Sequence, residues 1–352
     1  MSDNMTRMDR HRQAEQEKQA KIDKKKKKQT PNTPEFSSGD ANSKQPKNKK
    51  SKKKKSKLRK VGLVLLILLV LGFIGYFKGL MSAKMDKDNL QPDVGSFQGQ
   101  KSNDGSVNIL LLGSDSRGED QGRSDTIMIA HYDKKSKQPK IVSIMRDTFI
   151  GIPTSDGLEY NKINAAYAYG GPELVRQTIS NTFDIPIQYY AIVNFESFPK
   201  IVDTLAPSGL KINAEKDLEV EGTVIKKGEQ KMTGEEALQY ARFRKDEEGD
   251  FGRVRRQQQV ITAVLKQTMN PLSLWRVPEA LGKIQGYTQT DIPLNFYVST
   301  GASYLFSSHK SLEILTVPVE GSWSYGNYDY AGSVLEIDEA MNKEAIQNFF
   351  NP

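Results

Sequence analysis

Apolar residues occur along the chain in one long uninterrupted run and in many short ones. The long run covers residues 61–77, contains no charged residue and is bounded by Lys60 and Lys78. Its length is at the lower limit for a helix that crosses a bilayer, and the sixty residues before it are unlike the short leader of a cleaved secretory signal. Lys and Arg crowd its N-terminal side. We therefore predict a transmembrane signal-anchor helix over residues 61–79, in a single-pass type II cell membrane protein with a cytoplasmic N-terminus and an extracellular main domain.

The short runs after the anchor have the spacings of strands and helices. Apolar runs over 107–112, 126–132 and 141–145 predict largely buried strands. Thr233 and Glu236 form a capping-box pattern before a helix that ends at Arg242. Other apolar patterns predict helices over 172–183 and 198–205, a strand over 189–193, a helix that begins near Gly252, and elements around Leu281 and over 296–305 and 312–319.

This order of elements predicts one mixed α/β domain. We expect a central β-sheet flanked by helices within residues 106–352. Residues 80–105 are polar and have no sustained period, so they are predicted to form a stalk between membrane and domain. Residues 1–60 combine lysine runs with Gln, Asn, Ser and Pro. They are predicted to be a disordered cytoplasmic tail, either simply solvated or attracted to anionic lipid headgroups.

The net charge of +8 is unevenly distributed along the chain. Residues 1–60 contain 21 Lys and Arg against 7 Asp and Glu, so the tail carries +14 and the remainder −6. A duplex-binding domain normally carries the positive excess itself, so no direct nucleic acid partner is expected. The chain has no cysteine, which excludes disulfides and thiol chemistry. Its three scattered histidines predict neither a zinc cluster nor a Ser-His-Asp triad.

The densest group of candidate functional side chains lies in residues 240–259, which contain five arginines and three consecutive glutamines. Arginine presents rigid, charged donors that match phosphate oxygens two at a time. On a helix that begins near Gly252, Arg253, Arg256 and Gln257 share one face. In an extended segment Arg242 and Arg244 share one side. We therefore predict phosphate binding by Arg242, Arg244, Arg253 and Gln257, and interpret Lys245 and Arg255 as surface partners of Asp246, Glu247 and Glu248.

Two further motifs follow predicted strands. The two short motifs at residues 113–117 and 122–126 together hold two carboxylates and two arginines. A hard cation such as Mg²⁺ binds one or two carboxylates together with phosphate oxygens, so Asp115 and Asp125 are candidate ligands. The alternative is two ordinary turns capped locally by Asp and Ser. Arg146 and Asp147 follow a strand end, which suits a binding residue. Arg146 is a candidate phosphate donor, and Asp147 either a base or a support for Arg146.

Five segments together carry a specific resemblance to a known family. They are NILLLGSDSR (108–117), GRSDTIM (122–128), SIMRDTFIGIP (143–153), KINAAYAYGG (162–171) and YARFRKDEEGDFGRVRRQQQ (240–259). Over about residues 105–265 the chain closely resembles the LytR-CpsA-Psr (LCP) family. The short cytoplasmic tail, single anchor and external domain fit that family too. The resemblance implies an LCP-type α/β domain.

The resemblance also implies an enzyme. It would transfer an anionic glycopolymer, such as wall teichoic acid or capsule, from an undecaprenyl pyrophosphate carrier to peptidoglycan, through a phosphodiester bond. By position, Asp115 and Asp125 would bind Mg²⁺ (or Mn²⁺), and Asp250 would orient the arginines. Arg146, Arg253, Asp125 and Asp147 are the candidate catalytic residues, with Asp147 or Asp125 as general base. The pyrophosphate would be bound by Arg117, Arg123, Arg146, Arg242, Arg244, Arg253 and Gln257.

The family encloses the polyprenyl chain in an apolar tunnel. Candidate lining residues are Tyr167, Tyr190, Phe195 and Phe198, for which plain core packing is the alternative. Two other functions compete with glycopolymer transfer. One is a polyprenyl-pyrophosphate phosphohydrolase, with water as acceptor. The other is a non-enzymatic transcriptional attenuator. The predicted topology opposes direct DNA binding, because only the tail faces the cytoplasm, but regulatory effects can arise indirectly through changes at the wall.

Overall fold

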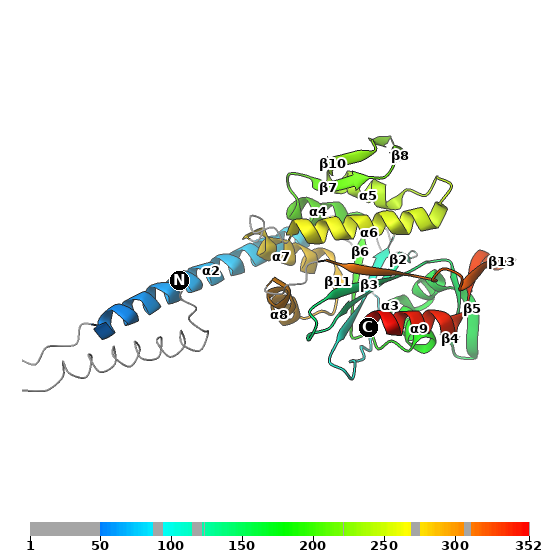
Figure 1. The fold of residues 1–352 in the computed structure, drawn as a ribbon, viewed down its shortest axis with the longest axis horizontal. Coiled ribbons are helices and arrows are strands. Elements are labelled where there is room, and N and C mark those ends of the chain that lie inside the picture. The colour runs from blue at the N-terminus through cyan, green and yellow to red at the C-terminus, as the bar shows by residue number, and fades with distance from the viewer. Residues whose placement is uncertain are drawn as a thin grey trace, which may run out of the picture. The chain divides into compact units, whose positions relative to one another are not determined.

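The computed structural model describes residues 50–86, 94–114, 122, 124–220, 222–268, 275–305 and 311–351. The chain divides into two units, Met1–Lys60 and Val61–Pro352. The second unit is a mixed α/β domain with several sheets (Figure 1). The fold class predicted from the order of apolar runs is therefore confirmed.

The largest sheet has the strand order β11-β6-β1-β2-β3-β12. Its three central strands pair antiparallel, whereas β6 pairs parallel with β1 and β12 parallel with β3. The four strands predicted from apolar runs are β1, β2, β3 and β6. The strands of this sheet are β1 (Val107–Ser114), β2 (Ser124–Tyr132), β3 (Pro139–Ile144), β6 (Tyr189–Asn194), β11 (Gln289–Thr290) and β12 (Glu313–Val317).

Helices α3 (Ile163–Phe183) and α9 (Glu339–Phe350) cover one face of this sheet. Leu110 and Val142 of the sheet are fully buried in one core cluster with Ile179 of α3 and Ile346 of α9. The predicted helix over 172–183 is the second half of α3. A kink separates it from the first half, because Gly171 has a φ of +61°, in the left-handed region that favours glycine. The last helix, α9, was not predicted.

The other face of the sheet carries helices α4 (Ser197–Leu205), α5 (Gly234–Arg242) and α6 (Gly249–Thr268), as Figure 1 shows. The predicted capping box is present: the Glu236 backbone N–H donates to Thr233 Oγ1 at 3.2 Å, and the Thr233 N–H donates to Glu236 Oε2 at 2.7 Å. These helices share a second core with two small antiparallel sheets. One sheet pairs β7 (Leu210–Ala214) with β10 (Gly228–Met232), and the other is the hairpin of β8 (Leu218–Val220) and β9 (Thr223–Ile225) between them in the chain.

A second sheet has the strand order β13-β14-β4-β5. The sequence did not predict these strands, because segments such as GLEYNK and WSYGNY contain no apolar run. β4 and β5 form one hairpin and β13 and β14 another, and only the pairing of β14 with β4, which are distant along the chain, joins them into one sheet. The strands are β4 (Thr148–Thr154), β5 (Gly157–Lys162), β13 (Trp323–Tyr328) and β14 (Gly332–Ile337).

Helix α2 (Lys50–Lys84) extends beyond the predicted anchor at both ends. Its residues 50–60 belong to the segment predicted to be disordered, and residues 80–84 to the predicted stalk. Within the described residues, its part Arg59–Lys84 is the one helix long and apolar enough to cross a membrane, with a mean hydropathy of 2.4. The rest of the predicted stalk also differs, because Val94 and Phe97 pack against the main core.

The end of α2 contacts helix α7 (Val277–Tyr287) through glycines on both helices. A Cβ atom at Gly79 would lie 2.1 Å from the Glu279 carbonyl oxygen, and one at Gly282 would lie 2.0 Å from the Tyr76 carbonyl oxygen. Small residues allow this close backbone approach between helices. The contact is closed by an ion pair of 3.2 Å between Lys78 and Glu279. Helix α8 (Leu294–Leu305) follows α7 and β11.

Candidate phosphate site and its apolar cavity

Two arginines from distant parts of the chain share one carboxylate. Arg146, between β3 and β4, donates from Nε to Asp250 Oδ2 at 2.9 Å. Arg253, on the first turns of α6, donates from Nη2 to the same oxygen at 2.9 Å. The turn before α6 ends at Gly249, whose φ of +50° favours glycine, and this turn places Asp250 in the first turn of the helix. Asp250 therefore holds two guanidinium groups side by side.

Three further charged side chains complete this cluster. Arg146 Nη1 donates to Asp125 Oδ1 at 2.5 Å, and Arg253 Nη1 lies 3.8 Å from the same oxygen. Lys162, the last residue of β5, binds Asp147 Oδ1 at 3.0 Å. The cluster thus balances three cationic groups against three carboxylates. Its side chains are largely buried, from 5% exposed for Arg253 to 26% for Asp125.

The two neighbouring carboxylates have pKa values displaced in opposite directions. Burial raises the pKa of Asp250 above its usual value, although Arg253 and Arg146 oppose this shift. Burial acts on Asp147 in the same sense, but the hydrogen bond from Lys162 and the charge of Arg146 lower its pKa overall. Burial lowers the pKa of Arg253, which arginine tolerates without losing its charge. Displaced pKa values within one cluster of side chains are typical of functional sites.

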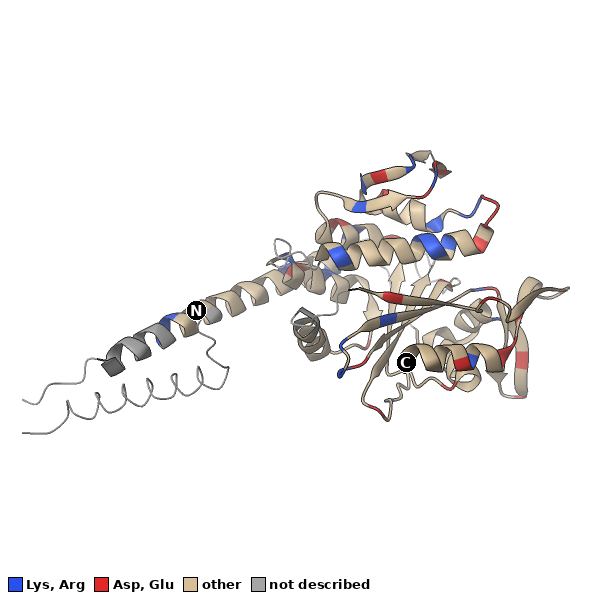
Figure 2. Cartoon of the chain, in the orientation of Figure 1, with Lys and Arg blue, Asp and Glu red and all other residues tan. Residues whose placement is uncertain are grey.

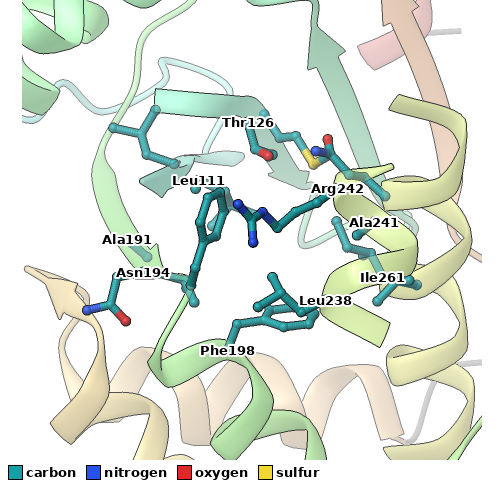
Figure 3. Close-up of a pocket in the computed structure, with 16 residues that line it drawn as sticks. Leu111, Thr126, Ala191, Asn194, Phe198, Leu238, Ala241, Arg242 and Ile261 are labelled. Carbon is teal, nitrogen blue, oxygen red and sulfur yellow. The ribbon is translucent and has the colours of Figure 1, made fainter. Parts of the chain in front are cut away.

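An apolar cavity of about 240 Å³ lies beside the cluster, between the large sheet and helices α4, α5 and α6. Its walls include Leu111, Met128 and Leu238. Figure 3 shows the guanidinium group of Arg242, at the end of α5, pointing into this cavity. That group stacks over the ring of Phe195, with 4.7 Å between the guanidinium carbon and the ring centroid.

The cluster and the cavity are adjacent. Thr126 lines the cavity, and Asp125 precedes it on β2. Gln257 also lines the cavity, and Arg253 lies one helical turn before it on α6. A ligand with a charged group among the arginines and an apolar chain in the cavity therefore fits both.

The structure separates the arginines that the sequence placed together. Figure 2 shows basic residues concentrated in the first half of α6. Arg256 does not join Arg253: its fully buried side chain donates to Glu215, Asp246 and the Phe243 carbonyl oxygen. Arg244 does not share the side of Arg242, since it is exposed in the loop after α5.

The surface interpretation holds for Arg255 but not for Asp246. Arg255 binds Glu248 as expected, and also Glu215, which the sequence did not indicate. Asp246 is not a surface partner, because its side chain is only 10% exposed and binds Arg256. A buried arginine needs compensating carboxylates, and this demand explains the difference.

Two of the four predicted lining residues do line the cavity, and two do not. Phe195 and Phe198 line it. Tyr167 and Tyr190 do not: Tyr167 is fully buried in the core between α3 and the large sheet, and Tyr190 packs against Phe97 at 4.8 Å. For these two tyrosines the alternative of core packing applies. Lys162 was not predicted as a site residue, because nothing in its local sequence indicates the contact with Asp147.

Three predicted residues, Asp115, Arg117 and Arg123, lie outside the described residues. Asp125 lies within β2 rather than in a loop. Within the described ranges, no three His, Asp or Glu side chains are grouped to hold a metal ion. Asp125 is nevertheless a hard oxygen donor, and Mg²⁺ commonly takes only one or two carboxylates with phosphate oxygens and water. The donor type fits, and the metal site stays a prediction.

Comparison with known proteins shows which family this chain belongs to. The model of the LytR_cpsA_psr family matches residues 74–346. Regulatory protein MsrR of Staphylococcus aureus (strain COL) is 43% identical over 259 residues, which cover 73% of this chain and 78% of the relative. The polyisoprenyl-teichoic acid--peptidoglycan teichoic acid transferase TagU of Bacillus mycoides is 39% identical over 219 residues, 61% of this chain and 69% of the relative.

Solved structures agree with this relationship. B. subtilis TagV superposes with a TM-score of 0.61 at 29% identity, over 72% of this chain and 97% of TagV. The structure of TagT bound to LIIa-WTA superposes with a TM-score of 0.55 at 25% identity, over 74% of this chain and 95% of TagT.

Proposed function

Because the chain belongs to the LytR-CpsA-Psr family, we propose that it is a membrane-anchored phosphotransferase. It moves an anionic glycopolymer from a polyprenyl pyrophosphate carrier to peptidoglycan. Wall teichoic acid is the proposed cargo class, since one relative is named a teichoic acid transferase and the similar TagT structure carries LIIa-WTA. We propose that α2 anchors the chain with its tail in the cytoplasm and the domain outside.

One observation carries the proposal: the doubly shared Asp250 carboxylate beside an apolar cavity. Arg146 and Arg253 are held before any ligand arrives, so they need little reorganisation to bind phosphate oxygens. Preorganised donors of this kind are the main source of catalysis in phosphoryl transfer. Arg242 and Gln257 line the cavity, and Gln257 lies one helical turn after Arg253. A pyrophosphate at the arginines and a polyprenyl chain among Leu111, Phe198 and their neighbours match this arrangement.

The reaction follows from the groups at hand. A sugar hydroxyl oxygen of the acceptor attacks the phosphorus atom that carries the glycopolymer. The bond from this phosphorus to the bridging pyrophosphate oxygen breaks, and polyprenyl phosphate leaves. The hydroxyl proton passes to a carboxylate, for which we propose Asp147 or Asp125. Asp147 is deprotonated at neutral pH and can accept the proton, but its lowered pKa makes it a weak base. Arg146 and Arg253 stabilise the charge that develops on the phosphate oxygens.

We further propose that Asp125 contributes to binding of Mg²⁺ or Mn²⁺. Such an ion, when bound, would neutralise phosphate charge. Asp125 already contacts Arg146 through Oδ1, so it connects the proposed metal with the arginine cluster.

The test compares two arginines of the same helix. The full-length protein, in lipid nanodiscs, receives a lipid-linked pyrophosphate glycopolymer and uncrosslinked peptidoglycan, and wall-linked polymer is measured. Arg253→Ala should reduce transfer by about 10²-fold or more, the usual effect of removing one preorganised donor. Arg255→Ala should leave transfer unchanged, because Arg255 is 44% exposed and binds Glu215 and Glu248 away from the cluster. Equal transfer by both variants would contradict the site.

The same assay separates transfer from hydrolysis. Polymer phosphate that appears free in solution, with peptidoglycan present, would identify a phosphohydrolase instead. The MsrR relative is named a regulatory protein. In this proposal any effect on cell-wall integrity, antibiotic resistance or gene expression is an indirect consequence of polymer transfer.

A further inference from the structure

The second sheet presents an aromatic face that leads away from the arginine cluster. Phe149 of β4 stacks on Tyr328 of β13, with 4.5 Å between ring centroids and 11° between ring planes. Phe149 also lies 5.9 Å from Tyr160 of β5, and Tyr328 lies 5.7 Å from Tyr330. The four rings therefore form one contiguous surface across β13, β14, β4 and β5.

This face is open to solvent in the part of the chain that the structure describes. Tyr330 is 63% exposed, Leu158 60% and Tyr160 47%. The opposite face is covered, because Ile150 and Ile152 of β4 belong to the core against α3. Side chains alternate along a strand, so Phe149 must point away from that core. Contiguous exposed apolar surface of this kind is typical of binding sites.

The aromatic face is continuous with the candidate phosphate site. Asp147 lies in the turn just before β4, and Lys162 is the cross-strand partner of Phe149. Lys162 in turn binds Asp147 at 3.0 Å. From Thr148, next to Asp147, to Gly151, opposite Tyr160, the strand covers about 10 Å. A ligand that lies along these rings thus reaches the carboxylate proposed to accept its proton.

Two glycines keep the face flat. A Cβ at Gly151 would lie 3.2 Å from the Leu158 side chain, and one at Gly326 would lie 2.6 Å from Glu336 Oε1. Glu336 lies over Gly326 and accepts a hydrogen bond of 2.6 Å from the Tyr328 hydroxyl. The surface therefore combines flat rings with hydroxyl groups and one carboxylate at their edges.

These properties select one class of ligand. A pyranose ring presents C–H groups on its faces and hydroxyl or amide groups at its edges, so it packs on an aromatic ring while its edge forms hydrogen bonds. A polyanion is disfavoured on this face. Among the described residues of its four strands, the alternation of side chains places only two charged residues there, Lys162 and Glu336, and Lys162 is already paired. Figure 2 shows β13 without charged residues. An acceptor glycan fits this face better than the anionic donor polymer does.

We infer that the face formed by Phe149, Tyr160, Tyr328 and Tyr330 binds the glycan strand of the peptidoglycan acceptor and guides its hydroxyl group to Asp147. The inference rests on the proposed function and deepens it by locating the acceptor. Donor and acceptor then approach the arginine cluster from different sides, the polyprenyl chain from the cavity under α5 and α6 and the glycan from the second sheet. Figure 1 shows this sheet at the end of the domain opposite to α7 and its contact with the anchor helix.

The experiment uses the full-length protein in nanodiscs and a soluble glycan oligomer of alternating N-acetylglucosamine and N-acetylmuramic acid, whose lactyl carboxyl groups are capped as amides so that the oligomer is uncharged. Calorimetry measures its binding to the wild type, to the double variant Tyr160→Ala with Tyr330→Ala, and to Tyr325→Ala. Tyr325 is the matched control, since it is 70% exposed on the same hairpin but alternates to the other face of β13. The double variant should bind the oligomer about ten-fold more weakly or worse, as expected for exposed aromatic anchors.

Transfer kinetics give the second readout. The KM for the acceptor should rise in the double variant, while the KM for the lipid-linked donor and the binding of a polyprenyl pyrophosphate stay unchanged. Unchanged oligomer binding and acceptor KM in a wild type that transfers polymer would overturn the inference alone. An equal loss in Tyr325→Ala, or self-association through this face without glycan binding, would overturn it too. Aromatic-dependent glycan binding without any transfer would instead remove the proposed function.

Discussion

Replacing Asp250 by asparagine separates the stability of the arginine cluster from its activity. Asparagine keeps the shape of the side chain and one acceptor oxygen, but it removes the charge that Arg146 and Arg253 share. The two hydrogen bonds, each 2.9 Å long, involve charged groups and contribute about 1.5–3 kcal/mol apiece when isolated. Burial opposes this gain, because it raises the pKa of Asp250.

The sign of the stability change follows from that pKa. A carboxyl group whose pKa is higher in the folded than in the unfolded chain binds its proton more tightly in the folded state. Ionised Asp250 therefore lowers the free energy of unfolding at neutral pH, and this cost is relieved as pH falls through its folded pKa. Asp250→Asn removes this cost, and it also weakens both hydrogen bonds, because their acceptor becomes a neutral amide oxygen. We expect the free energy of unfolding to change by no more than about 1 kcal/mol, because the relieved cost of burying the charge offsets the weakened hydrogen bonds.

Asp147→Asn should behave in the opposite way. The pKa of Asp147 is lowered in the fold, so its ionised form stabilises the protein above the unfolded pKa, and this contribution is lost as pH falls through the folded pKa. The variant leaves Lys162, 23% exposed, without its carboxylate partner. The expected loss is about 1–2 kcal/mol, or roughly 2–8 °C in Tm for a domain of this size.

Thermal unfolding of the full-length variants in detergent at pH 7 measures the stability, and polymer transfer measures the activity. Asp250→Asn should keep its Tm while transfer falls by about 10²-fold, because the two arginines lose the group that places them. A large drop in Tm for Asp250→Asn, or wild-type transfer in that variant, would refute the reasoning about the shared carboxylate.

Three further predictions concern other parts of the fold. Burial lowers the pKa of His131 to about 4, whereas a histidine in the unfolded chain has a pKa of about 6.5, so the unfolded chain binds more protons between these two pH values. The free energy of unfolding should therefore fall by about 3 kcal/mol from pH 6.5 to 4, and urea titrations of His131→Gln should show a weaker dependence of that free energy on pH. Gly282→Leu should separate α7 from α2, because a Cβ there meets the Tyr76 carbonyl oxygen at 2.0 Å. In the otherwise cysteine-free chain, a short thiol cross-linker should join Lys78→Cys to Glu279→Cys, but not after Gly282→Leu. Gly62→Leu, with open space around it, is the control. Ala241→Trp should fill the cavity and raise the KM for a long-chain polyprenyl donor, with little effect on a short-chain donor; an equal effect on both donors would contradict a lipid-binding role for the cavity.

Local patterns in the sequence were sufficient where one short segment determines the structure. Thr233 and Glu236 cap α5 reciprocally because both partners lie within one helical turn. The apolar runs of β1, β2 and β3 predicted the centre of the large sheet, since these strands are buried on both sides. The helical spacing of Arg253 and Gln257 correctly brought both to the side of α6 that faces Asp125 and the cavity.

Long-range contacts account for what the sequence did not predict. Arg256 has nearly the same helical position as Arg253, yet Glu215, which lies 41 residues away, draws it into a buried ion pair. Tyr167 and Phe195 are both aromatic, and only tertiary packing places one in the core and the other in the cavity wall. Lys162 reaches Asp147 because β5 pairs with β4, and the polar sequence of β5 does not reveal this pairing.

The central claim is that the chain joins the glycopolymer-bearing phosphate to peptidoglycan. Its most direct test uses two donors, one with radioactive phosphorus in the phosphate next to the glycopolymer and one with the label in the phosphate next to the lipid. With the full-length protein and peptidoglycan, the first label should become wall-linked and the second should remain on polyprenyl phosphate. Wall linkage of the first label and formation of labelled polyprenyl phosphate from the second donor should both disappear in Arg253→Ala and persist in Arg255→Ala. Release of the first label as soluble polymer phosphate, or its retention on the lipid with wild-type protein, would contradict the account.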